Sequence, residues 1–142
     1  MAALCDVNFL LALCDGAHEH HAIAVSWLEN AEAGSASVCR MAQPGLLRLL
    51  NNPAVMGDRV CTGAAAWRIW DALLADERFA FQAETQDLET HMRTFTAGLQ
   101  SSPKAWQDAY FAAFARAAGM DLVTFDDAFL KFRGLRAIVL GR

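Results

Sequence analysis

The stretch Ala2-Ala3-Leu4-Cys5-Asp6-Val7 places a carboxylate directly after a short apolar run. A carboxylate there costs free energy unless the strand ends and its side chain faces a polar cleft or a cation. The same pattern recurs where Asp126 follows Leu122-Val123-Thr124-Phe125, and Asp108 opens an apolar helical stretch. Because ligand crevices form at the strand ends of open parallel sheets, we expect Asp6 and Asp126 to meet there. Such a cluster predicts a site for Mg²⁺ or Mn²⁺, which take oxygen ligands.

The rest of the chain alternates short apolar runs with longer amphipathic stretches. Strands are predicted at residues 2–7, 36–39, 79–81, 122–124 and 137–140. Helices are predicted at residues 8–14, 18–33, 44–50, 62–76, 87–98 and 105–118, with a helical turn at 127–131. This alternation favours a three-layer α/β fold with a mainly parallel central sheet. Because no repeat or linker interrupts residues 1–142, we expect a single domain.

The composition is that of a globular chain. Among 142 residues, 55% are hydrophobic and 20% are charged, which excludes a disordered polar segment. No uninterrupted apolar stretch approaches the roughly 18 residues of a membrane span. The first residues lack the basic region of a signal peptide. We therefore expect a cytoplasmic protein without a membrane partner.

Charge is distributed unevenly along the chain. The net charge of −4 argues against general binding of polyanions. Residues 1–39 nevertheless contain five acidic residues and no Lys or Arg, whereas four bases and no acid occur from Lys131 onward. Arg40 and Arg48 bracket the segment after the second predicted strand. An acidic centre with a basic rim is typical of a metal-dependent nuclease, although scattered surface charge would look similar.

Cysteine and histidine spacing gives weaker signals. The chain has no CxxC pair, so buried reduced thiols are favoured over zinc binding for Cys5, Cys14, Cys39 and Cys61. His18, His20 and His21 have the composition of a nickel or zinc trap. In a turn ahead of a helix, a solvated surface is the favoured interpretation of these histidines.

Four segments, taken together, resemble a known family. Residues 4–13 (LCDVNFLLAL) resemble the opening motif of PIN domains, residues 106–113 (WQDAYFAA) their central acidic helix, and residues 122–129 (LVTFDDAF) their strand-end motif. Residues 43–55 (QPGLLRLLNNPAV) are similar to one branch of the VapC toxins of toxin–antitoxin pairs. The segments occur in the family's order and span nearly the whole chain.

This resemblance implies a PIN-like fold and an Mg²⁺- or Mn²⁺-dependent endoribonuclease that acts as a type II toxin. RNA would be its substrate, a cognate antitoxin its inhibitor, and a homodimer its usual assembly. Asp6 and Asp108 would ligate the metal, and Asp126 would complete the acidic wall. Asn8 and Thr124 would hydrogen-bond the ligands or the phosphate. The remaining candidate catalytic residue is Gln43, which stands where the family often has Glu and adds no negative charge.

Other interpretations stay open. Each acid alone has a structural explanation, since Asp6 could belong to a turn, Asp108 could favour a helix N-terminus and Asp126 could cap a helical turn. A PIN-like module that binds RNA or protein without cutting would explain Gln43. An aspartyl-phosphate phosphatase also carries an Asp after its first strand, but it needs a second Asp where Asn8 stands.

Aromatic residues raise a question about partners. The helix at 62–76 carries two apolar stripes, and one stripe satisfies a helix packed on a sheet, so a second implies another burial surface. We therefore predict that this helix contributes to a dimer or antitoxin contact, with complete burial inside its own domain as the alternative. The stripes are Trp67, Trp70 and Leu74, and Ala66, Ile69 and Leu73. Elsewhere, Trp106 is predicted in the core and Asp127 on the surface or at the helix start.

Overall fold

The computed structural model describes residues 2–142, which include a five-stranded sheet in the order β3-β2-β1-β4-β5. Every neighbouring pair of strands is parallel, so the predicted mainly parallel sheet is confirmed. All five strands lie where the sequence pattern placed them, and most are shorter than predicted. Their bounds are β1 Ala3–Cys5, β2 Ala36–Val38, β3 Phe79–Phe81, β4 Asp121–Thr124 and β5 Ala137–Val139.

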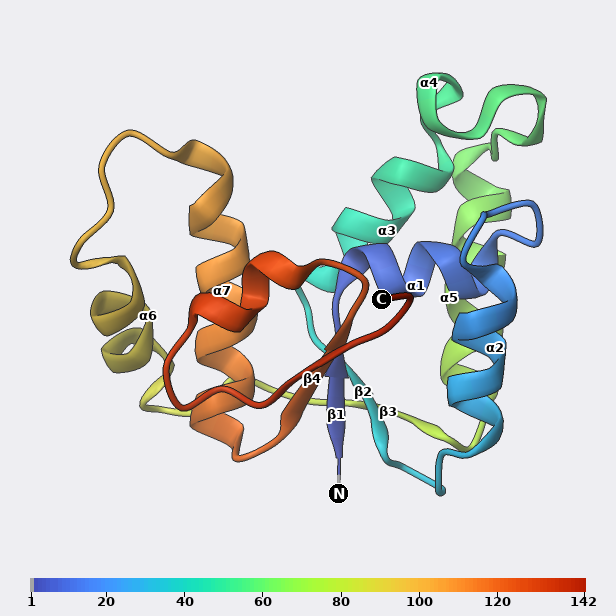
Figure 1. Ribbon diagram of the computed structural model, residues 1–142. Coiled ribbons are helices and arrows are strands. Elements are labelled where there is room, and N and C mark those ends of the chain that lie inside the picture. The colour runs from blue at the N-terminus through green and yellow to red at the C-terminus, as the bar shows by residue number, and fades with distance from the viewer. Residues whose placement is uncertain (1) are drawn as a thin grey trace.

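Helices cover both faces of the sheet, as the three-layer prediction requires. Figure 1 shows α6 and α7 on one side of the strands and α1, α2 and α5 on the other. No helix within residues 2–142 is long and apolar enough to cross a membrane. The α-helices are α1 Val7–Cys14, α2 His21–Glu29, α3 Ala42–Leu50, α4 Pro53–Met56, α5 Gly63–Ala75, α6 Leu88–Thr96 and α7 Pro103–Ala118. Two 3-10 helices are η1 Gly57–Arg59 and η2 Asp127–Lys131.

The burial of each strand agrees with its position in the sheet. Every residue of β1, β2 and β4 is buried, as expected for central strands that helices cover on both faces. The edge strands β3 and β5 are only partly buried. In the register, Cys5 lies beside Val123, so the residues that follow β1 and β4 emerge at the same edge of the sheet.

A close approach of two helices fixes the position of α3. A Cβ atom added at Gly45 would lie 2.8 Å from Cγ2 of Val7, so only glycine allows α3 to pack this tightly against the start of α1. Pro44 lies in the first turn of α3, where its missing N–H breaks no helical hydrogen bond. The helix ends at Asn51, as the Asn51-Asn52-Pro53 signal predicts.

Several predictions need correction. The first strand ends at Cys5 rather than at residue 7, because Asp6 caps the helix that follows. The helix predicted at 18–33 extends only over α2, since residues 15–20 form turns. Trp106 is 53% exposed, so its predicted core position is wrong. It lines a surface cavity together with residues of α6, whereas its neighbours Ala105 and Ala109 are buried.

The two stripes of α5 are partly buried within this chain. Ala66, Trp70 and Leu73 face the core, whereas Trp67 is 48% exposed. The helix is therefore not wholly buried in its own fold, and its role as an interface stays a prediction. Thr62 accepts a hydrogen bond from the N–H of Ala65 and caps the helix. Among residues 2–142 all four cysteines are free, with Cys5 and Cys39 buried and the other two partly exposed.

Candidate active site

The site begins at the junction between β1 and α1. Asp6 is only 4% exposed, and its Oδ1 accepts a hydrogen bond of 2.8 Å from the N–H of Phe9. This bond caps α1 and satisfies one of the free N–H groups of its first turn. Its own N–H donates to the carbonyl of Val123 on the neighbouring strand. The backbone therefore holds the Asp6 carboxylate at the carboxyl edge of the sheet.

Thr124 joins the ends of β1 and β4. Its hydroxyl donates to Oδ2 of Asp6 at 2.5 Å and accepts from the N–H of Asp126 at 2.9 Å. The side chain is fully buried, so these two bonds replace contacts with water. Asp6 and Asp126 thus lie at adjacent strand ends, as the sequence pattern predicts.

Asp126 has a capping function as well as an electrostatic one. Its Oδ1 accepts from the N–H of Ala128 at 2.9 Å and starts η2, which is the structural alternative that the sequence left open. Its Oδ2 lies 3.8 Å from Nζ of Lys104 at the start of α7. Asp127 is exposed in the first turn of η2, as predicted.

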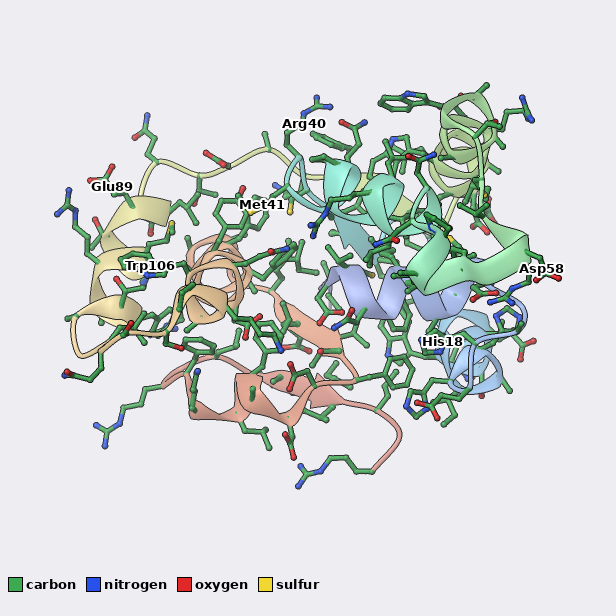
Figure 2. All side chains as sticks on the ribbon, turned by 90° about the horizontal axis from the view of Figure 1, so that it is seen from above. His18, Arg40, Met41, Asp58, Glu89 and Trp106 are labelled. Atoms are coloured by element: carbon green, nitrogen blue, oxygen red, sulfur yellow. The ribbon has the colours of Figure 1, made fainter. Side chains whose placement is uncertain are left out.

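Asp108 comes from the second turn of α7 and is half-buried. It lines a cavity of about 170 Å³ together with Asp6. Four further polar side chains line the cavity with the two carboxylates, and apolar side chains complete the lining. The polar ones are Asn8, Arg48, Lys104 and Gln107, and the apolar ones include Leu49, Phe111 and Phe129. Figure 2 views the molecule from this edge of the sheet.

The carboxylates disfavour one another's negative charge. The pKa of Asp6 is raised to about 6, chiefly by burial and also by Asp126 and Asp108, while the hydrogen bonds from Thr124 and Phe9 oppose the shift. Burial also raises the pKa of Asp108, as does Asp126, while Lys104 and Lys131 oppose the shift. Groups that share a site in this way are stabilised as anions by a cation.

The donor set fits a hydrated hard cation. Within residues 2–142, no three His, Cys, Asp or Glu side chains converge closely enough to form a complete metal cage. Mg²⁺ does not require one, because it usually keeps several waters and uses one or two carboxylates with phosphate oxygens. Asp6 and Asp108, facing one cavity with raised pKa values, supply oxygen ligands of that kind.

Gln43 is hydrogen-bonded to a neighbouring arginine. It is in the first turn of α3, and its Oε1 accepts a hydrogen bond of 2.8 Å from Nη1 of Arg40. Within residues 2–142, the side chains that line the cavity around Asp6 do not include Gln43. Its predicted catalytic role therefore stays a prediction.

Asn8 and three residues that the sequence did not assign complete the polar wall. Asn8 is exposed in the first turn of α1 and lines the cavity, as its predicted role requires. Lys104 and Gln107 share one face of α7 with Asp108, at spacings of four and one residues, so helical periodicity could have grouped Lys104 with Asp108. The sequence pointed to Arg48 only through its charge. Its position in the cavity lining could not be foreseen, because it depends on how α3 packs on α1.

Comparison with known proteins identifies the family to which this fold belongs. Residues 3–135 match the model of the PIN domain. The chain belongs to the PIN domain family. This PIN domain is 40% identical to Ribonuclease VapC41 of Mycobacterium tuberculosis, with 98% of this chain and 99% of the relative covered. It is 34% identical to Ribonuclease VapC38 of the same species, with 87% and 84% covered.

Solved structures show the same fold at low sequence identity. VapC20 of Mycobacterium tuberculosis, described as a sarcin–ricin loop cleaving toxin, has a TM-score of 0.69 and 20% identity, with 95% of this chain and 99% of that chain covered. VapBC2 of Rickettsia felis, solved with a fragment of promoter DNA, has a TM-score of 0.69 and 12% identity, with 98% of each chain covered. A toxin–antitoxin complex of Klebsiella pneumoniae has a TM-score of 0.64 and 18% identity, with 97% of each chain covered.

Proposed function

We propose that this PIN-domain protein is a metal-dependent endoribonuclease and the toxin of a type II toxin–antitoxin pair. The observation that carries the proposal is the cavity in which Asp6 and Asp108 face Arg48 and Lys104. Its carboxylates suit a cation, and its bases suit a phosphodiester. The 40% identity to a VapC ribonuclease over nearly the whole length supports the same assignment. Residues 1–142 would form one PIN-like domain.

The metal would be Mg²⁺ or Mn²⁺, held by Asp6 and Asp108 with Asp126 at the wall. When bound, such an ion lowers the pKa of water and stabilises negative charge on phosphate oxygens. Thr124 holds Asp6 in place through a hydrogen bond of 2.5 Å, and this supports a fixed ligand orientation. Lys104 and Arg48 neutralise the substrate phosphate, while Asn8 and Gln107 donate amide N–H groups that orient it.

Gln43 contributes no negative charge to this site. Its amide oxygen accepts a hydrogen bond from Arg40, so its contribution in this proposal is to hold the Arg40 guanidinium in place. A PIN-like module that binds without cutting remains the second candidate. One observation favours that candidate, the neutral residue at position 43.

Cleavage assays separate the two candidates. Wild type, Asp6→Asn and Asp108→Asn are incubated with RNA in Mg²⁺, in Mn²⁺ and in EDTA. Each substitution is expected to lower kcat/KM by about 1000-fold, because a cation ligand contributes several kcal/mol to the transition state. Asp71→Asn, which changes an exposed acid on α5, is the matched control. Full activity of Asp6→Asn would overturn the proposal, and inactive wild type in both metals would favour the binding module.

The partners of the proposal are RNA, a cognate antitoxin and a second copy of the chain, in the cytoplasm. Toxin–antitoxin complexes among the structural neighbours support the antitoxin partner. Trp67, exposed on α5, is the proposed anchor of one contact. Trp67→Glu should weaken assembly in light scattering with and without antitoxin, whereas Ala72→Glu, exposed on another face of the same helix, should not. Unchanged assembly of folded Trp67→Glu would exclude α5 as the interface.

A further inference from the structure

A second polar cavity lies beside the proposed active site. It has a volume of about 480 Å³, and Asn8 lines both this cavity and the one that contains Asp6. Asp126 lies in its wall, next to aromatic and basic side chains from two distant segments. These segments are the turn between α1 and α2, which carries His18 and His20, and the stretch after β5, which carries Arg142. A chain bound across the carboxylates would enter this second cavity.

A stack of rings builds one wall of the cavity. The Phe125 ring stacks on His20, with centroids 4.6 Å apart and planes 9° apart. Phe125 also packs against the fully buried Phe9, with centroids 6.1 Å apart and planes 17° apart. The core therefore anchors the stack and fixes the plane of the His20 ring. The His18 ring lies 5.7 Å from His20 and is tilted by 41°, so it does not continue the stack.

The segment after β5 is shaped to lie against these rings. Gly141 has a positive φ of 75°, which favours glycine, and an added Cβ would lie 3.2 Å from Cδ1 of Phe125 and 3.5 Å from His20. This close packing brings the following residue, Arg142, to the cavity. Figure 1 shows this end of the chain beside α1, above the strand ends. Arg142 thus lines the cavity together with its aromatic wall.

The histidines are not arranged as a metal trap. Nδ1 of His18 accepts from the N–H of His20 at 3.0 Å, and Nδ1 of His21 is bonded to the carbonyl of Ala12 at 2.8 Å. Nε2 of His20 lies 3.5 Å from the Glu19 carboxylate. No group of three metal-binding side chains occurs in the part of the chain that the structure describes. These rings are therefore available for a different ligand.

We propose that this cavity is a nucleotide subsite, which binds the base next to the phosphodiester that the enzyme cuts. The inference rests on the proposed ribonuclease function, and it assigns a substrate-binding role to His18, His20 and Arg142. Single-stranded RNA is read by proteins through bases that stack on aromatic or imidazole rings and form hydrogen bonds along their edges. The fixed Phe125–His20 wall offers the rings, and Arg142 offers a partner for the flanking phosphate.

The acidic residues of the cavity fit this assignment. Glu19 and Asp127 also line it, and carboxylates accept hydrogen bonds from the N–H groups of a base rather than from a phosphate. Asn8, which is common to both cavities, would lie between the base and the reacting phosphate. The base therefore occupies the second cavity, and the cut phosphodiester lies in the first.

Binding is measured first, because it does not depend on cleavage. The full chain is titrated with each of the four ribonucleoside 5′-monophosphates while the ring protons of His18, His20 and Phe125 are followed by NMR. We expect ring-current shifts with nucleotides and none with inorganic phosphate, and a loss of about tenfold in affinity in His20→Ala. His91→Ala, a half-buried histidine on α6, is the control. No shift with any nucleotide would overturn the subsite, whether or not the protein cuts RNA.

Cleavage then locates the subsite relative to the cut. Wild type and His20→Ala act on a pool of random RNA of about 12 nucleotides, and the products are sequenced. We expect wild type to show a base preference at one position flanking the cut, and His20→Ala to lose that preference and raise KM about tenfold with little change in kcat. An unchanged preference in His20→Ala would overturn the subsite and leave the ribonuclease assignment intact. Inactive wild type would instead count against the ribonuclease, and the binding titration would decide the subsite alone.

Discussion

The ends of β1 and β2 lie side by side in one sheet, yet their polar groups are arranged in opposite ways. After β1, Asp6 is buried and receives hydrogen bonds only from neutral donors, while Asp108 and Asp126 add repulsion. After β2, the Arg40 guanidinium lies 4.7 Å from the centre of the Phe81 ring and donates to the neutral Gln43. Of these two strand ends, only the end of β1 gathers negative charge, and a cation would be stabilised there.

The largest expected effect tests the repulsion around Asp6. A carboxyl whose pKa is raised from 3.8 to about 6 stabilises the fold below its unfolded pKa, and that stabilisation is lost as the pH rises through about 6. Asp6→Asn removes the titration and keeps an oxygen that can cap α1. In EDTA, the variant should therefore exceed wild type in unfolding free energy by on the order of 3 kcal/mol at about pH 8.

Urea unfolding from about pH 4 to about pH 8 checks this prediction. The difference between the two proteins should shrink toward the acid end, where Asp6 is protonated in the folded chain and becomes partly protonated in the unfolded chain, whose pKa is near 3.8. Saturating Mg²⁺ should stabilise wild type and have little effect on Asp6→Asn. A variant that is less stable than wild type at every pH would mean that the hydrogen bonds of Asp6 outweigh its burial and the repulsion.

The second prediction tests the link between the two strand ends. Thr124→Val keeps the shape of the buried side chain but removes the hydroxyl that holds Asp6. Loss of a residue that orients a metal ligand typically lowers affinity or activity about 10- to 100-fold. We expect a loss of this size in the Mg²⁺ dependence of cleavage, whereas Thr124→Ser should lie close to wild type. Equal Mg²⁺ dependence in wild type and Thr124→Val would show that Thr124 does not contribute to metal binding.

The sequence predicts well that Asp6 and Asp126 lie at the same edge of the sheet, because a local pattern marks each of them. Each carboxylate follows a short apolar run, and strand alternation with helices is enough to make both strands parallel. Their adjacency follows from the topology, in which β1 pairs with β4. The capping bonds of Asp6 and Asp126 were also foreseeable, since Asp is a preferred residue before a helix.

The remainder of the site depends on packing that no local pattern contains. Lys104 reaches Asp126 only because the start of α7 meets η2, and Arg48 enters the cavity only because Gly45 lets α3 approach Val7. Trp106 was predicted in the core rather than as a residue that stacks on the substrate, but the α6–α7 pair leaves it exposed, and Figure 2 shows it beside α6. Hydrophobicity predicts burial only when the orientation of the helix is known.

The smallest expected effect concerns the end of β2. Gln43→Glu adds a negative charge where the PIN-domain resemblance implies a ligand, so tighter Mg²⁺ or Mn²⁺ binding is expected. The structure limits that gain, because Arg40 lies 2.8 Å from the Gln43 oxygen and would pair with the new carboxylate. We therefore expect no more than about a threefold increase in affinity by calorimetric titration, as for a charge pair near the surface.

Removing Arg40 tests whether its pairing with the new carboxylate limits the effect of Gln43→Glu. In an Arg40→Ala background the new carboxylate is unpaired, so Gln43→Glu should raise metal affinity more strongly than it does beside Arg40. Gln107→Glu, which adds the same charge directly in the cavity wall, is the positive control and should give the larger increase. If Gln107→Glu tightens binding while Gln43→Glu has no effect even without Arg40, then Gln43 lies beyond the reach of the metal. The cation would then depend on the carboxylates near β1 and β4 alone.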